Sequence, residues 1–192
     1  MKKLALLVLL SLLACSGMYE VPETHYLIPV GKHESRIVGG FIGDKIRTLK
    51  RDRIEFTARF DETVRYDLGN RNQDDINKLM GFSEANQHHQ QNSIRFGWRY
   101  LKASDNIEIL AYAYQEGDQW YQSVAKVEIN ETVGYSIQIE DEAFILTVGE
   151  SSLEVLRLKA RERGLYYMLF PYFGGNETAP HDINIFISES FR

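Results

Sequence analysis

The sequence of 192 residues has little that would stabilise or target it in familiar ways: one cysteine, Cys15, four prolines, no run of basic residues and no internal repeat. A single cysteine excludes an intramolecular disulfide and a zinc site built from several cysteines. The formal net charge at pH 7 is −5, from 22 Lys and Arg against 27 Asp and Glu. An acidic chain of this kind argues against a nucleic-acid partner and against electrostatic attraction to anionic lipid. Stability must therefore come from an apolar core.

A long apolar run occurs only at the N-terminus, where Lys2 and Lys3 precede the segment from Leu4 to Leu13. A charged start followed by a short apolar segment predicts a secretory signal, which is too short to span a membrane stably. The run ends in Leu-Leu-Ala-Cys at residues 12–15, which resembles the lipobox of bacterial lipoproteins. That resemblance implies cleavage before Cys15 and acylation of its thiol and new amine.

The lipobox resemblance divides the chain into a signal peptide at 1–14, a lipidated Cys15 with a short tether at 15–23, and a single domain at 24–192. Loss of Lys2 and Lys3 leaves 20 basic against 27 acidic residues, a net charge of −7. Membrane contact is therefore expected through the acyl chains alone. We expect attachment in the bacterial cell envelope, at the outer membrane in preference to the inner one. The alternative is a plain signal peptide with an incidental cysteine.

Hydrophobic residues alternate with polar ones through most of the chain beyond residue 23, as in half-buried strands. Turn residues separate these segments, and only residues 73–80 are predicted to make a helical turn or two. Such spacing favours an antiparallel β-sandwich or barrel over an α/β fold. The predicted strands are at 54–60, 94–100, 107–113, 135–139, 144–148, 153–158, 165–173 and 183–187.

Three segments carry a resemblance to a known group of folds: the hairpin YSIQIEDEAFILTVGE at 135–150, the preceding NIEILAYAYQEGDQW at 106–120, and the following LFPYFGGN at 169–176. They are similar to the strand series of concanavalin A-like lectin and laminin-G jelly rolls, and the likeness spans residues 93–187. It implies an all-β, antiparallel two-sheet sandwich of jelly-roll type. It also implies a carbohydrate or glycoconjugate partner, although one fold supports many functions.

The segment from Ser93 to Gln115 is predicted to form a hairpin with its turn near Ala103-Ser104. Pairing about this turn places Arg95 opposite Tyr112, on the face away from Trp98. The same pairing sets Arg99 against Glu108, while Gly97 opposite Leu110 leaves a hole between the two arginines.

This face is the predicted ligand-binding surface, because tyrosine rings can stack on sugars and arginines can donate to hydroxyl or carboxylate oxygens. Two polar loops are expected to border it, one around the histidine pair of NQHHQQN at 86–92 and one in PYFGGNETAPHD at 171–182. The alternative is a solvated face with ordinary cross-strand pairs. The candidate ligand-binding residues are Arg95, Arg99, Glu108, Tyr112, Tyr114, His88, His89, Asn176 and His181.

No cofactor is expected. The only set that could converge on a metal comprises His88 or His89 with His181 and Asp182, and loop hydrogen bonding is the expected role of these side chains. Calcium binding is left open at one cluster of oxygen ligands. The spacing of these residues fits no standard calcium loop, and a solvated turn is therefore predicted there. That cluster comprises Asp67, Asn70, Asn72, Asp74 and Asp75.

Binding rather than catalysis is the main functional expectation, and no catalytic residue is assigned. The carboxylates at 140–142 straddle a hairpin turn, which is unlike the paired carboxylates of sandwich glycosidases. A lyase acting on a uronate polymer stays open, because Tyr112, His88 or His89 could act as a base. Arg95, Arg99 or the amide of Gln90 could neutralise the uronate carboxylate. A protein-interaction or scaffold module is the third possibility, and it would require an exposed apolar strip.

Overall fold

The computed structural model describes residues 22–41, 45–49, 52–158 and 164–190. The predicted signal peptide, the lipidation site Cys15 and most of the predicted tether lie outside the described residues. No helix within the described ranges has both the length and the apolar composition needed to cross a membrane.

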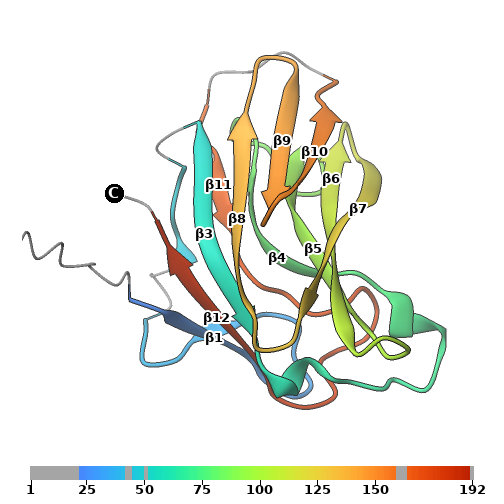
Figure 1. Cartoon of the computed structure of the whole chain (residues 1–192). Coiled ribbons are helices and arrows are strands. Elements are labelled where there is room, and N and C mark those ends of the chain that lie inside the picture. Colours follow the sequence, from blue (N-terminus) through green and yellow to red (C-terminus); the bar gives the residue numbers. More distant parts are fainter. Residues whose placement is uncertain (1–21, 42–44, 50–51, 159–163, 191–192) are drawn as a thin grey trace, which may run out of the picture.

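The described chain forms two antiparallel β-sheets packed face to face, as the sequence predicts (Figure 1). The larger sheet has the strand order β10-β9-β8-β3-β12-β1-β2, and the smaller has the order β11-β4-β5-β6-β7. In the larger sheet the strands are β1 (Thr24–Ile28), β2 (Arg36–Ile37), β3 (Arg53–Phe60), β8 (Thr132–Ile139), β9 (Ala143–Val148), β10 (Ser151–Leu156) and β12 (Ile183–Glu189). In the smaller sheet they are β4 (Asn77–Ser83), β5 (Ser93–Leu101), β6 (Asn106–Gln115), β7 (Asp118–Glu128) and β11 (Tyr167–Leu169).

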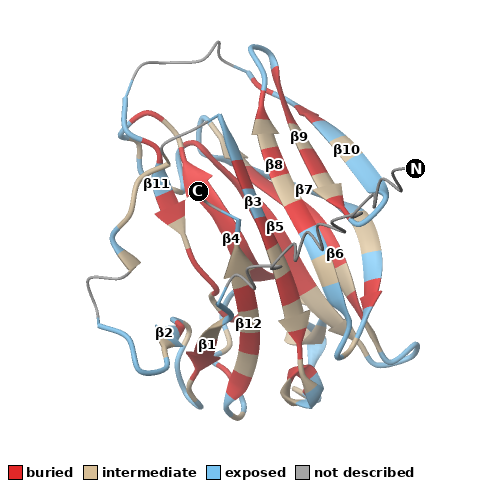
Figure 2. Cartoon of the chain, turned by 60° about the vertical axis from the view of Figure 1, so that its left-hand side comes forward, coloured by how far each residue is buried: buried red, intermediate tan, exposed pale blue. Residues whose placement is uncertain are grey.

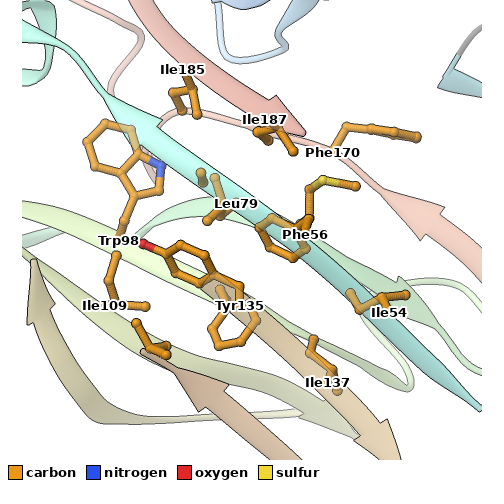
Figure 3. Packing of buried hydrophobic residues seen from close by; sticks show 14 of the residues in the cluster. Ile54, Phe56, Leu79, Trp98, Ile109, Tyr135, Ile137, Phe170, Ile185 and Ile187 are labelled. Carbon is orange, nitrogen blue, oxygen red and sulfur yellow. The ribbon is translucent and has the colours of Figure 1, made fainter. Parts of the chain in front are cut away.

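The core lies between the two sheets and is built from the alternating residues that the sequence indicates. Along β3, buried Ile54, Phe56, Ala58 and Phe60 alternate with residues that contact solvent, and Figure 2 shows this banding. Trp98 of β5 is fully buried, and its ring lies 5.3 Å from that of Phe60 across the sandwich. Figure 3 shows aromatic and branched aliphatic side chains from both sheets meeting in this layer. Burial of these apolar side chains supplies the stability that the missing disulfides cannot.

Residues 73–80 are not helical beyond a single turn, which corrects one local prediction. A 3-10 turn, η3 (Arg71–Asp74), is followed at once by strand β4. Every residue of β4 is buried, because its outer face is covered as well as its inner face. A strand buried on both faces shows no alternation of hydrophobic and polar residues, so its sequence pattern does not reveal it.

The predicted hairpin forms as β5 and β6, and its register is confirmed. Arg95 pairs with Tyr112, Gly97 with Leu110, and Arg99 with Glu108. On the other side of β5, Gly81 of β4 pairs with Arg95 next to an irregularity in the ladder. A Cβ atom on Gly81 would lie 2.2 Å from both the Arg95 Cβ and the Ile94 carbonyl oxygen. Gly81 therefore allows the backbones of β4 and β5 to approach closely beside Arg95.

Candidate functional site

A pocket of about 660 Å³ lies on the outer face of the five-stranded sheet. Its most buried polar lining residues are Lys78 from β4, Arg95 from β5 and Tyr112 from β6. The rest of the wall comes from β7, from the loops at 86–92 and 171–182, from Glu34 and from residues 74–76. The predicted hairpin face is therefore part of a half-open polar pocket rather than a flat surface.

Arg95 is a buried cation that has no ion-pair or hydrogen-bond partner among the described residues. The residue is only 7% exposed, and its buried Nε has no hydrogen-bond partner there. The guanidinium carbon lies 5.4 Å from the centroid of the Tyr112 ring, which gives a cation–π contact. Burial lowers the pKa of Arg95, but a guanidinium starts from so high a value that it stays charged. Most buried charges in proteins are paired, so a buried guanidinium that faces a pocket without a charged partner is unusual.

Lys78 is a second buried cation beside the same ring. Its Nζ donates hydrogen bonds to the carbonyl oxygens of Ile76 at 2.7 Å and Gly174 at 2.9 Å, and it lies 5.0 Å from the Tyr112 centroid. Burial and then the positive charge of Arg95 lower the pKa of Lys78 to about 8, and the negative charge of Asp75 opposes this shift. At neutral pH both Lys78 and Arg95 are therefore charged.

The loop at 171–182 is fixed to β4 by backbone contacts. Tyr172 and Lys78 exchange two backbone hydrogen bonds, of 2.8 and 3.0 Å, and the Gly174 amide donates to the Asn77 side chain. Gly174 has φ of +69°, and a Cβ there would lie 2.3 Å from the Glu177 carbonyl oxygen. The sequence interpretation of this glycine as turn chemistry is confirmed. Figure 1 shows the loop continuing from the smaller sheet to β12 of the larger one.

Four tyrosines line the pocket. Tyr112 and Tyr114 meet edge to face, with ring centroids 5.8 Å apart, and the Tyr114 hydroxyl donates to Gln119 Oε1 at 3.3 Å. Tyr121 of β7 pairs with Tyr112 and is half exposed, whereas Tyr172 stacks on His33 at 5.1 Å. Burial raises the pKa of Tyr112. The pocket therefore combines aromatic faces with phenolic hydroxyl groups.

The loop at 86–92 contributes His89 and Gln90 to the pocket, but not His88. The two histidine rings are 4.2 Å apart, and His88 Nδ1 accepts a hydrogen bond from the Gln90 amide. Burial, followed by the charges of Arg95 and His88, lowers the pKa of His89. His89 is therefore neutral at pH 7, which leaves one ring nitrogen able to accept a proton.

The structure separates the predicted site residues into two groups. Arg99 is paired with Glu108 at 2.6 Å and also donates to the Asp74 carbonyl oxygen, and neither Arg99 nor Glu108 lines the pocket. His181 lies elsewhere and contacts the Thr63 carbonyl oxygen at 2.7 Å. The predicted residues that do share the pocket are Arg95, Tyr112, Tyr114, His89 and Asn176.

Gly97 does not leave the open hole that the sequence predicts between the two arginines. A Cβ there would lie 2.5 Å from Ile76 Cγ2, so the Ile76 side chain occupies that space. Ile76 forms a small apolar cluster with Leu110 and Tyr112 on the outer face. This cluster separates the paired Arg99 from the unpaired Arg95.

Sequence reasoning missed Lys78, Tyr121, Tyr172 and Gln119, which also line the pocket. Lys78 lies on β4 and the pair Gln119 and Tyr121 on β7, two strands that the sequence analysis did not identify. The sequence pattern places Tyr172 at the end of a predicted strand, where its side chain has no predicted partner. The one available signal was the aromatic and basic content of these segments.

No group of three or more His, Cys, Asp or Glu side chains in the described part of the chain could hold a metal ion. The oxygen ligands considered for calcium make local contacts instead. Asp67 pairs with Lys102 at 2.5 Å, Asn70 accepts from the Asn72 amide, and the Asn72 side chain donates to Glu177.

No protein-family model matches this chain, and no curated protein matches it either. Solved structures do resemble it. The alginate lyase AlyC3 has a TM-score of 0.54 and 12% identity over 85% of this chain and 71% of that one. AlyC3 in complex with dimannuronate gives 0.50 and 9%, over 86% of each chain. The GH16 protein of a Bacteroides ovatus mixed linkage glucan PUL, in complex with its G4G4G3G product, has a TM-score of 0.50 and 13% identity over 87% of this chain and 78% of that one.

These neighbours are carbohydrate-active proteins of the concanavalin A-like jelly-roll type. At this level of identity the likeness shows the fold. The predicted jelly-roll sandwich is confirmed.

Proposed function

We propose that this protein binds glycan in the pocket on its five-stranded sheet, while acyl chains on Cys15 hold it in the bacterial cell envelope. The observation that carries the proposal is Arg95, a buried guanidinium that no described residue neutralises, facing a pocket lined with tyrosines. Tyrosine faces stack on sugar rings, and the forked guanidinium donates to oxygen atoms. Proteins of similar fold that act on alginate and mixed linkage glucan support the same interpretation.

A glycan array tests the binding proposal with the mature chain. We expect binding by the wild type and a loss of at least tenfold in Tyr114→Ala, whose ring lines the pocket. Tyr167→Ala is the matched control, because Tyr167 is a partly exposed tyrosine on β11 of the same sheet, outside the pocket. An empty array, together with capture of a protein partner by the wild-type chain, would favour the scaffold alternative.

Metabolic labelling with an alkyne analogue of palmitate tests the anchor. The full-length chain should acquire label and fractionate with the outer membrane. Cys15→Ala should lose both the label and the membrane association. Labelled Cys15→Ala, or wild type found only in the soluble fraction, contradicts lipidation at this residue.

The pocket also favours the uronate lyase as a second candidate function, because His89, Arg95 and Tyr112 line one pocket. Neutral His89 would remove the proton at C5 of a uronate whose carboxylate is neutralised by Arg95. The C4–O4 bond then breaks, a C4–C5 double bond forms, and the leaving oxygen takes a proton from a tyrosine or water. Incubation with uronate polymers should produce the ultraviolet absorbance of the unsaturated product, and a flat trace removes this candidate.

A further inference from the structure

We infer that Lys78 and Arg95 form an anion subsite, so that the pocket selects acidic sugars over neutral ones. The ligand group is an oxyanion, a carboxylate or a sulfate, carried on a sugar ring. This inference rests on the proposed glycan-binding function and adds the class of glycan. It also adds Lys78, which the sequence pattern did not indicate.

The two cations flank one aromatic ring. Arg95 and Lys78 lie 5.4 and 5.0 Å from the Tyr112 centroid, and each is less than a tenth exposed. Neither has a described carboxylate within the 4.0 Å of an ion pair. Two like charges buried beside each other are costly, and the contacts with one ring and two carbonyl oxygens offset only part of that cost. An anion entering the pocket would compensate both charges at once.

The other arginines of the fold show that this chain normally supplies a carboxylate. Buried Arg157 pairs with Glu84 and also donates to the carbonyl oxygens of Glu140 and Asp141. Five further described arginines form ion pairs with Asp or Glu, namely Arg47, Arg53, Arg59, Arg65 and Arg99. On β5 itself, Arg99 has Glu108 as its cross-strand partner, whereas Arg95 has the ring of Tyr112. Arg36 and Arg71 also form no ion pair among the described residues, but both are exposed to solvent. Of the two buried described arginines, Arg157 has a carboxylate partner and Arg95 has none.

The pocket lining also contains three acidic residues, Glu34, Asp74 and Asp75. Glu34 and Asp74 are exposed to solvent and Asp75 is half-buried, so water screens them far more than it screens the two buried cations. The positive charge is deep and the negative charge is at the rim. A ligand that presents one acidic group inward and hydroxyl groups outward fits this arrangement.

The first experiment measures affinity by calorimetry for size-matched oligosaccharides that are neutral, uronate-containing or sulfated. We expect the acidic ligands to bind at least about 30-fold more tightly than the neutral one, since each desolvated charge contact is worth 2 kcal/mol or more. Arg95→Met and Lys78→Met should each abolish that preference, and Lys78→Gln is included because its amide can still donate to a carbonyl oxygen. The matched control is Arg99→Met, which removes the same charge from the same face of the same strand where a carboxylate already compensates it.

The second experiment separates failure of the subsite from failure of the proposed function. Thermal unfolding is followed with sodium glucuronate or sulfate against sodium chloride of equal ionic strength. Sulfate stabilises folded proteins in general, so the comparison is between variants. Greater stabilisation of the wild type and Arg99→Met than of Arg95→Met and Lys78→Gln supports the subsite even if no oligosaccharide binds. Equal responses in all variants, or a neutral oligosaccharide bound as tightly as the acidic ones, overturn it. If the preference is confined to sulfate or to uronate, that arm identifies the acidic group.

Discussion

Replacement of Arg95 by methionine should make the fold more stable. The guanidinium is buried and unpaired, and its one described favourable contact is with the Tyr112 ring. A cation–π contact of this kind contributes about 1–2 kcal/mol, while burial of an unpaired charge costs several kcal/mol after relaxation. Methionine keeps most of the volume and removes the charge, so we expect a net gain in the free energy of unfolding of roughly 1–3 kcal/mol.

Arg157→Met is the matched comparison, because Arg157 is similarly buried but forms an ion pair with Glu84. Its loss leaves Glu84 and the carbonyl oxygens of Glu140 and Asp141 without this donor. We expect this variant to lose about 3–5 kcal/mol, the usual result of breaking a buried ion pair from one side. The two substitutions are chemically identical, yet the predicted changes in stability have opposite signs.

Urea unfolding of the unliganded mature chain measures both values. Calorimetric melting provides a second readout, since 1 kcal/mol corresponds to about 2–4 °C in Tm for a domain of this size. If Arg95→Met loses more than about 1 kcal/mol, Arg95 supports the fold and the functional argument from its missing partner is wrong.

The remaining predictions concern the pocket charge and the packing around it. The pKa of Lys78 is lowered to about 8, so between pH 8 and 10 the unfolded chain binds the proton that the folded chain has lost. Stability to urea should therefore rise over this range and affinity for an acidic ligand should fall, and neither trend should survive in Lys78→Met. Gly81→Ala should cost roughly 1–3 kcal/mol, because a Cβ there collides with the backbone at Ile94 and Arg95, and unchanged urea unfolding would contradict the close approach. Tyr135→Phe should be neutral or stabilising by about 1 kcal/mol in a thermal melt, because no described residue bonds to this buried hydroxyl, and a clear loss of stability would contradict that view.

The sequence predicts the strands that bury one face and leave the other in water. That pattern is clear in β3, β8 and β12. The sequence of β5 alternates in the same way although its first six residues are all buried, and the short turn between β5 and β6 then determines their register. The pattern fails at β4, which is buried on both faces, and at β7, an edge strand exposed along most of its length. In both strands the two faces have the same environment, so no alternation is required.

The same two strands explain what the sequence could not predict about the site. Arg95 and Tyr112 follow from the hairpin register, but Lys78 and Tyr121 depend on strands without a signal. Equally, the sequence predicts the pairing of Arg99 with Glu108, whereas only the three-dimensional packing of Ile76 shows that Arg99 is separated from the pocket. A contact between segments distant in the chain leaves no trace in local periodicity.

The loop at 171–182 connects the pocket to the N-terminal side of the domain, so force on a bound ligand can be transmitted along it. It is bonded to Lys78 at one end and continues into β12, which pairs along its length with β1, the first strand after the predicted tether. Tension from a long polymer held in the pocket would therefore pass through this loop to β12 and β1. The hairpin of β5 and β6 would share that load, because Arg95, Tyr112 and Tyr114 hold the polymer and β5 pairs with β4.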